Sequence, residues 1–141
     1  MAKTSTLDEI DRRLLRLLKK NSRESHVNLA RQLESSEGTV RARLKRLVEQ
    51  GFIREFTVRT AGANVKALIE VATDTNIDTS RLSEDIASWD GVEVVYEVSG
   101  DEDILVVAEA DNTTQLNELI ERIRNLPNVR STRSRVILKE A

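Results

Sequence analysis

The chain contains no cysteine and few histidine, proline, glycine and aromatic residues. Its 141 residues include one His, one Pro, five Gly, one Trp, one Tyr and two Phe. Without cysteine there is no disulfide framework, no thiolate zinc site and no cysteine nucleophile, and the lone His26 excludes a cluster of histidine ligands. These absences argue against redox, zinc and histidine-based enzymes, so we expect no catalytic residues, no metal site and no cofactor.

Long hydrophobic runs are missing as well. No apolar run approaches the ~20 residues that a membrane-spanning helix needs, and the first residues lack the apolar stretch of a signal peptide. Hydrophobic residues make up 39% of the chain, which is enough for a packed core. We therefore expect a globular cytoplasmic protein with no membrane partner.

Charge is divided unevenly along the chain, although the net charge is only −2. Residues 1–59 hold 14 Lys and Arg against 8 Asp and Glu, a balance of +6, whereas residues 60–141 hold 8 against 16, a balance of −8. Such asymmetry suggests two domains with different partners, the basic one being the candidate for binding a polyanion. The sign changes at the stretch 60–64, so we predict domains at residues 1–59 and 60–141.

The basic half has the pattern of three short helices. Apolar residues recur at steps of three and four over residues 7–18, 25–34 and 36–50. Only residues 34–36 separate the second stretch from the third, which leaves room for a tight turn alone. The Ser36 hydroxyl can cap the third helix, and Gly51 is a stop signal. This spacing predicts a helix-turn-helix.

The third helix carries a basic face opposite its apolar stripe. A helix of this kind fits the major groove of B-DNA, where guanidinium groups bind guanine edges and cations neutralise phosphates. An ordinary solvated basic helix is the alternative. Residues 52–58 are interpreted as a strand that covers the core or pairs with another subunit. The predicted DNA-contacting residues are Ser36, Gly38, Thr39, Arg41, Arg43, Lys45, Arg46 and, after that helix, Arg54.

The acidic half alternates strand and helix patterns. Strands are predicted at residues 65–72, 92–98, 103–110 and 129–138, with helices at 79–89 and around 116–126. The order βαββαβ is the ferredoxin-like arrangement, in which two helices cover one face of a four-stranded antiparallel sheet. Because the other face then needs cover, we expect a homodimer through the sheets.

Four segments together resemble the Lrp/AsnC family of transcription regulators: residues 7–15, 36–47, 51–53 and 94–105. The resemblance covers essentially the whole chain in the right order. It implies an α+β protein with an N-terminal winged-type helix-turn-helix, a linking strand and a C-terminal ferredoxin-like βαββαβ sensor domain. It also implies dimers that often assemble into octamers, with an amino acid or related metabolite bound between dimers. Glu102 stands where the family often has an aromatic residue.

The resemblance also implies an effector pocket in the acidic half. A carboxylate there would bind the α-amino group of an amino acid, and hydroxyls with turn amides would hold its α-carboxylate. Additional acids such as Glu97 favour lysine or arginine, with glutamine as the neutral alternative. Each residue also has a purely structural explanation in a turn or strand. The predicted pocket residues are Tyr96, Gly100, Asp101, Glu102, Asp103, Thr132 and Ser134.

The preferred function is a sequence-specific regulator that binds a pseudo-palindromic site in double-stranded DNA and responds to an amino acid effector. A metabolite-binding enzyme or regulatory subunit is one alternative, since ferredoxin-like sheets host many activities. An enzyme needs a nucleophile with a base, or a metal, and neither pattern is present. A DNA-organising protein with little sequence preference is the other alternative, and it would show a small ratio of specific to non-specific affinity.

Overall fold

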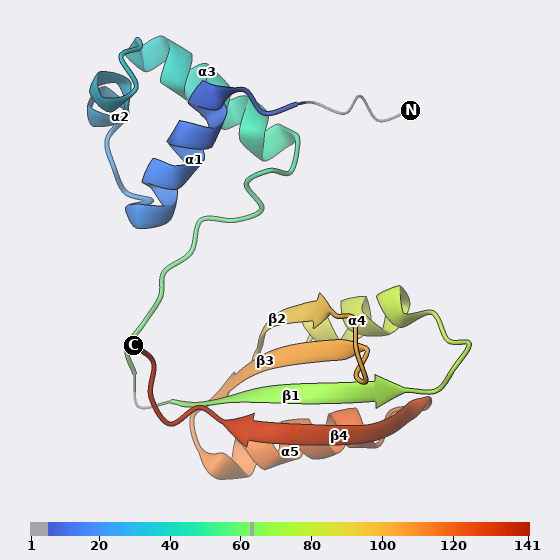
Figure 1. Ribbon diagram of the computed structural model, residues 1–141. Helices are drawn as coiled ribbons and strands as arrows, with labels where there is room; N and C mark the ends of the chain where they lie inside the picture. Colours follow the sequence, from blue (N-terminus) through green and yellow to red (C-terminus); the bar gives the residue numbers. More distant parts are fainter. Residues whose placement is uncertain (1–5, 63) are drawn as a thin grey trace. The chain divides into compact units, whose positions relative to one another are not determined.

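The computed structural model describes residues 6–62 and 64–141, which form two compact units that divide after Thr60. The first unit contains α1 (Glu9–Lys20), α2 (His26–Gln32) and α3 (Glu37–Glu49). The second contains β1 (Val65–Thr73), α4 (Thr79–Ala87), β2 (Val92–Glu97), β3 (Ile104–Ala110), α5 (Thr113–Arg124) and β4 (Val129–Val136), as Figure 1 shows.

Side-chain caps decide where the helices of the first unit begin. The Asp8, Ser25 and Ser36 side chains each accept a hydrogen bond from the backbone N–H three residues later. Such a cap satisfies one of the four N–H groups that a helix start leaves without a partner. At α1 the bond is reciprocal, because the Asp8 N–H donates to Asp11 Oδ2 at 3.1 Å. The predicted cap at Ser36 is therefore confirmed.

The first unit is a helix-turn-helix held by one apolar core. Side chains from all three helices and the turn meet with little or no solvent exposure, among them Leu14, Leu29, Leu33, Val40 and Leu47. Between α2 and α3 the chain turns at Glu34, whose φ is 53°, and the Ser35 N–H donates to the Ala30 carbonyl at 2.9 Å. The short turn predicted from the sequence is confirmed.

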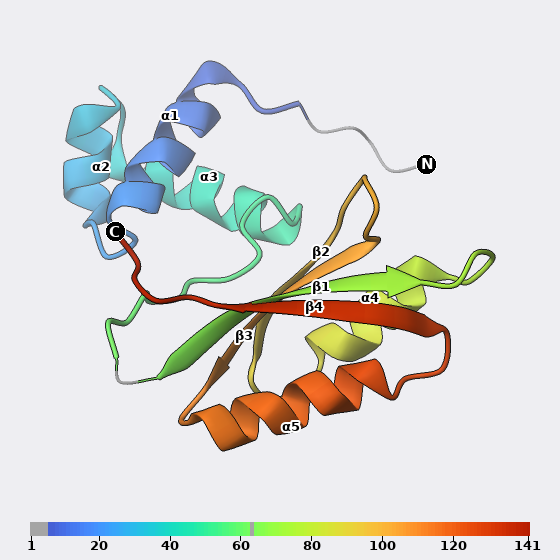
Figure 2. The same cartoon turned by 60° about the horizontal axis from the view of Figure 1, so that its bottom comes forward.

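The second unit is a ferredoxin-like sheet with the strand order β2-β3-β1-β4, and every neighbouring pair is antiparallel. Figures 1 and 2 show α4 and α5 on the same face of this sheet. That face is apolar because alternate residues of β1 and β3, such as Ile69 and Val106, are buried against Ile86 of α4 and Ile123 of α5. The predicted βαββαβ arrangement is confirmed.

The opposite face of the sheet carries a mixture of apolar and charged side chains, and no helix of this unit packs on it. Leu68 and Val107 lie opposite each other there and are only partly buried. Glu70 accepts a hydrogen bond from Arg135 of β4 at 2.8 Å. We call this surface the open face of the sheet.

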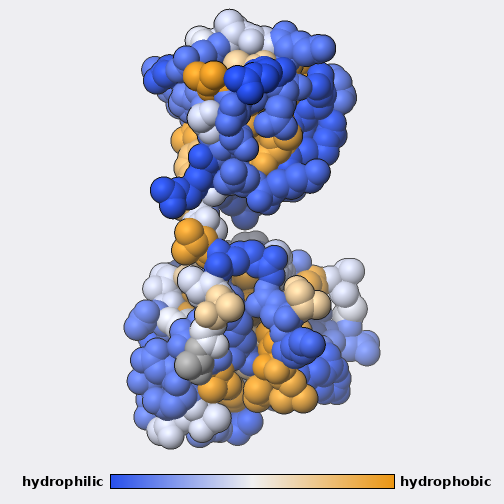
Figure 3. All heavy atoms as spheres, turned by 90° about the vertical axis from the view of Figure 1, so that its left-hand side faces the viewer, coloured by the Kyte–Doolittle hydropathy of each residue, from blue (hydrophilic) through white to orange (hydrophobic). Residues whose placement is uncertain are grey.

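Residues 52–58, predicted as a strand that covers the core or pairs with another subunit, form no strand within the single chain. A strand needs a neighbouring strand to bond its N–H and C=O groups. The described elements of the first unit are all helices, so none provides such a neighbour. Phe56 and Val58 are left 60% and 76% exposed. They add to the hydrophobic patches on an otherwise largely hydrophilic surface, some of which Figure 3 shows. In the described part of the chain, no helix combines the length and apolarity needed to cross a membrane.

Candidate nucleic-acid interface

The outer face of α3 presents small residues at its leading end and cations further along. Gly38, Thr39, Arg41 and Lys45 are all exposed, whereas Val40 of the same helix is fully buried. Apart from the helix's own nearby backbone, no heavy atom of residues 6–62 and 64–141 lies within 4 Å of the position that a Gly38 Cβ would occupy, so this end of the helix is open to a partner. The Ser36 hydroxyl is engaged at the cap, bonded to the Thr39 N–H and 2.8 Å from Thr39 Oγ1.

Within the described part of the chain, the ion pairs of these outer-face cations are exposed to solvent. Arg41 lies 2.8 Å from Glu37, and Lys45 lies 3.9 Å from Glu49, one helical turn away in each case. Their side chains are 65% and 77% exposed. Exposed pairs of this kind contribute about 0–1 kcal/mol, so a phosphate or a base edge can displace the acid at little cost.

Two other predicted contacts, Arg43 and Arg46, differ from Arg41 and Lys45, because both bind carboxylates of α1. Arg43 Nη1 donates to Asp8 Oδ2 at 2.6 Å and to Asp11 Oδ1 at 2.8 Å, and Arg46 Nη2 donates to the same Asp11 oxygen at 2.6 Å. The side chains of Arg43 and Arg46 are 21% and 35% exposed, against 1% for Asp11. Both arginines lie on the flank of α3 that faces α1, where they bind the carboxylates of Asp8 and Asp11.

The buried carboxylate of Asp11 is ionised by its partners. Burial raises its pKa, but hydrogen bonds from Arg46, Arg43 and the Asp8 backbone outweigh burial and lower the pKa to about 2. The same contacts raise the pKa of the Arg43 guanidinium, chiefly through hydrogen bonds to Asp8 and Asp11. We call Asp8, Asp11, Arg43 and Arg46 the α1–α3 ion cluster.

The sequence did not reveal Asp8 and Asp11 as partners of α3. A signal was present, because Asp11 is three residues from Leu14 and seven from Leu18 and therefore shares the apolar stripe of α1. A carboxylate on a buried stripe requires a charged or hydrogen-bonding partner. Here Arg43 and Arg46 of α3 are the charged partners of Asp11.

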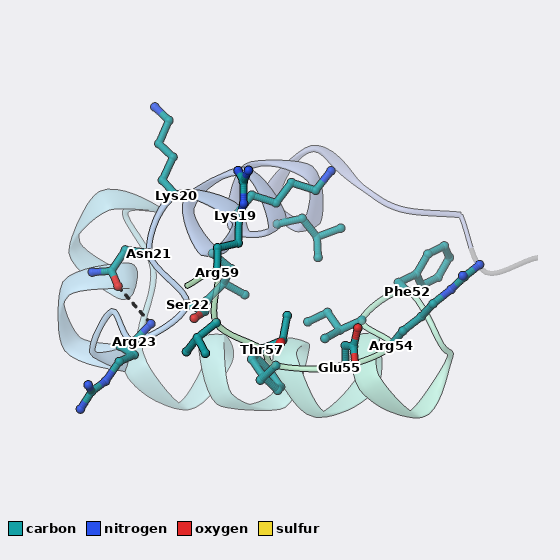
Figure 4. A pocket seen from close by; sticks show the side chains of 15 residues that line it. Lys19, Lys20, Asn21, Ser22, Arg23, Phe52, Arg54, Glu55, Thr57 and Arg59 are labelled. Atoms are coloured by element: carbon teal, nitrogen blue, oxygen red, sulfur yellow. Dashed lines mark hydrogen bonds between the residues drawn. The ribbon is translucent and has the colours of Figure 1, made fainter. Parts of the chain in front are cut away.

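A groove of about 690 Å³ lies between the end of α1 and residues 52–59. The predicted contact Arg54 is one of the residues that line it. Figure 4 shows this groove with Arg54 next to Phe52, and with Lys20 and Arg23 pointing away from it. Arg54 is exposed, as a phosphate contact must be.

The predicted effector residues lie close to one another along the strand direction, but they are divided between the two faces of the sheet. Tyr96 pairs with Leu105, which is opposite Glu70, so Tyr96 is on the open face. Thr132 pairs with Val71 and Ser134 with Ile69, both of which point into the helix-covered core. Strands β2 and β4 are the two edges of the sheet, about 14 Å apart at ~4.8 Å per strand spacing. One copy therefore does not bring Tyr96 to the two hydroxyls.

Within the turn between β2 and β3, most predicted groups already have partners. Gly100 has a φ of +134°, so the turn itself accounts for that glycine. Asp103 Oδ2 accepts from the Thr73 N–H at 2.7 Å and the Thr73 hydroxyl at 2.8 Å, and these bonds lower the pKa of Asp103. Glu102 lies 3.6 Å from Arg133 of β4. Asp101 is exposed.

Of the remaining polar groups near this turn, one has hydrogen-bond partners within the described part of the chain and another has none there. Glu97 accepts hydrogen bonds from Ser83 at 2.9 Å and Ser80 at 3.3 Å, both on α4. Thr132 Oγ1 is buried and has no hydrogen-bond partner among the residues that the structure describes. Across residues 6–62 and 64–141 no three His, Asp or Glu side chains are grouped to hold a metal ion.

Two family models match the chain. The first is described as winged helix-turn-helix DNA-binding and matches residues 7–54, and the second, the Lrp/AsnC ligand binding domain, matches residues 66–141. Among curated proteins, the HTH-type transcriptional regulator LysM of Saccharolobus solfataricus is 39% identical over 136 residues, which is 96% of each chain.

Solved structures have the same fold over nearly the whole length. The leucine response regulatory protein of Mycobacterium tuberculosis superposes with a TM-score of 0.79 at 28% identity and covers 95% of this chain and 94% of its own. A transcriptional regulator from Neisseria meningitidis, solved as an L-Met complex, gives 0.75 at 23% identity, covering 96% and 92%. The chain therefore belongs to the Lrp/AsnC family, as a transcriptional regulator with a DNA-binding winged helix-turn-helix and a ligand-binding domain.

Proposed function

We propose that the chain acts in the cytoplasm by placing the outer face of α3 in the major groove of double-stranded DNA. The observation that carries this proposal is the exposed combination of Gly38, Thr39, Arg41 and Lys45 on a helix fixed by a helix-turn-helix core. Small residues at the leading end let the helix approach base edges, and the two cations reach bases or phosphates. Arg54 adds a phosphate contact beyond the helix.

Selection of duplexes from a random pool, followed by fluorescence anisotropy, tests this assignment. Arg41→Ala and Lys45→Ala are each expected to weaken binding of the selected site by about 5- to 150-fold while leaving the helix content unchanged, because each removes one contact worth about 1–3 kcal/mol. Val27→Ala, on the exposed side of α2, serves as a matched control. Wild-type affinity in both α3 variants would contradict the assignment.

A homodimer is the proposed unit that meets a pseudo-palindromic site, with octamers as the higher assembly. The open face of the sheet and the exposed Phe56 and Val58 support it, because both leave apolar surface that a second copy can bury. Leu105→Asp, on the open face, is expected to give a monomer in sedimentation equilibrium, whereas Val27→Asp stays dimeric. A wild-type mass of 15.9 kDa, with and without DNA, would contradict a dimer.

An amino acid is the proposed effector, with lysine or arginine ahead of glutamine. The ligand-binding family model supports an amino acid, and so does the L-Met bound to the Neisseria structure. The exposed Asp101 supports a cationic one, whereas Glu97 and Glu102 already have partners within the chain. Since Tyr96 and Thr132 lie on different faces of one sheet, the proposed pocket needs residues from two copies.

Thermal-shift measurements with lysine, arginine and glutamine test the effector. A ligand that binds only the folded state raises the melting temperature, so lysine or arginine should give the largest rise. Asp101→Asn is expected to reduce that rise, and it is a cleaner test than a change at Asp103, whose carboxylate holds Thr73 in place. No shift with any amino acid would contradict the proposal.

A further inference from the structure

We propose that Asp11, together with Asp8, is a positioning residue that sets the border of the DNA interface by holding Arg43 and Arg46 against α1. Resting on the proposed function, this inference adds that the two arginines do not contact DNA. The cations that do contact it from α3 are Arg41 and Lys45.

The contacts within the α1–α3 ion cluster differ in kind from those on the outer face. Asp11 Oδ1 accepts hydrogen bonds from both arginines, and its side chain is only 1% exposed. Removing one partner of such a cluster leaves another charge buried without compensation, which is strongly unfavourable. A DNA phosphate would have to replace Asp11 to recruit Arg43 or Arg46. Arg41 and Lys45 meet no such barrier, because their acidic partners are exposed to solvent.

The charges that line the hollow beside the α1–α3 ion cluster also disfavour phosphate binding there. A hollow of about 710 Å³ lies between the leading end of α3 and the start of α1, and it is lined by Gly38 and Thr39 as well as by the cluster. The two carboxylates of Asp8 and Asp11 cancel the charges of the two arginines in this lining. Asp8 is half exposed, with 52% of its side chain accessible, so an entering phosphate meets a negative charge. Phosphates are therefore directed to the Arg41 and Lys45 side of α3.

The salt dependence of binding separates cations that contact phosphate from cations held inside the protein. Each phosphate contact contributes about 0.9 to the slope of log Kobs against log salt concentration. Arg41→Gln and Lys45→Gln are thus expected to flatten this slope by about 1 each. Arg43→Gln and Arg46→Gln are expected to leave the slope unchanged, even where they lower the melting temperature.

Releasing the arginines provides the complementary test. Asp11→Asn keeps the shape of the side chain and removes its charge, so Arg43 and Arg46 become available to phosphates. We expect the slope on random-sequence duplex to become steeper by about 1 for each arginine that binds a phosphate, and the ratio of specific to non-specific affinity to fall. A role limited to folding would lower the melting temperature and leave the slope alone. Asp8→Asn, at the exposed position, gives the same test in a milder form.

Measurements are made by fluorescence anisotropy between 50 and 200 mM salt, a range in which phosphate contacts change affinity strongly. Circular dichroism confirms that each variant is folded at the temperature used. If Arg43→Gln or Arg46→Gln flattens the slope by about 1, or if Asp11→Asn leaves it unchanged, the inference is overturned and the proposed function stands. If the wild type binds no duplex, the proposed function itself is overturned.

Discussion

Replacing Asp11 by Asn should destabilise the first unit by an amount that depends on pH. The Asp11 pKa is lowered from 3.8 to about 2, and each pKa unit corresponds to about 1.4 kcal/mol of differential stabilisation. At pH 7 the ionised carboxylate therefore contributes about 2 kcal/mol to the free energy of unfolding. Asn has the shape of protonated Asp, so the variant should lose this contribution and keep the packing.

The direction of this pH dependence follows from the lowered pKa of Asp11. A group whose pKa is depressed by folding stabilises the protein fully above its unfolded pKa, and this contribution disappears as the pH falls through the folded pKa. The difference between wild type and Asp11→Asn should therefore be about 2 kcal/mol from pH 7 to pH 5 and about 1 kcal/mol at pH 3. Below pH 2 the two proteins should converge.

Urea unfolding at each pH provides the assay, with two probes in the same sample. Far-ultraviolet circular dichroism reports on all helices, whereas Trp89 and Tyr96 both lie in the second unit, so fluorescence follows that unit alone. The variant should shift the dichroism transition and leave the fluorescence transition in place. A wild-type-to-variant difference that is the same at pH 7 and pH 3 would refute the ionised, arginine-bound state of Asp11.

Three further substitutions test separate parts of the structure. Ser36→Ala should cost the first unit about 1 kcal/mol in urea unfolding, since the Thr39 N–H loses its cap; no loss would contradict the cap. Asp103→Ala should cost the second unit about 1–3 kcal/mol by Trp89 fluorescence, because the buried Thr73 loses its acceptor; a neutral result would contradict that role. Gly91→Ala should lower the fluorescence-detected melting temperature, because φ is +82° and the new Cβ would lie 3.2 Å from the Glu109 carbonyl; an unchanged temperature would contradict the strain.

Elements whose pattern is local to the sequence were predictable. The three helices of the first unit begin within two residues of the expected positions, because caps and apolar spacing are short-range signals. The βαββαβ order followed in the same way from alternation and turn residues. The strand expected at residues 52–58 does not form within the single chain, because an alternating pattern contains no information about whether a neighbouring strand exists.

Properties that depend on partners far away in the sequence were not predictable. Helical spacing showed that Arg43 and Arg46 lie off the apolar stripe, but their partner Asp11 is more than 30 residues away. In β4, polar residues occupy both faces, so alternation alone did not reveal that Thr132 and Ser134 point toward the helix-covered side. The pairing register with β1 settled that question.

The most direct test of the central claim is the ratio of affinities for a selected duplex and a random duplex, measured on the full chain at one salt concentration. Reading of base edges by the outer face of α3 predicts a ratio of at least about 10³, as specific DNA-binding proteins show. It also predicts that Arg41→Gln lowers the affinity for the selected duplex. A ratio near one, unaffected by Arg41→Gln, would contradict sequence-specific recognition by α3 and favour a protein that binds DNA regardless of sequence.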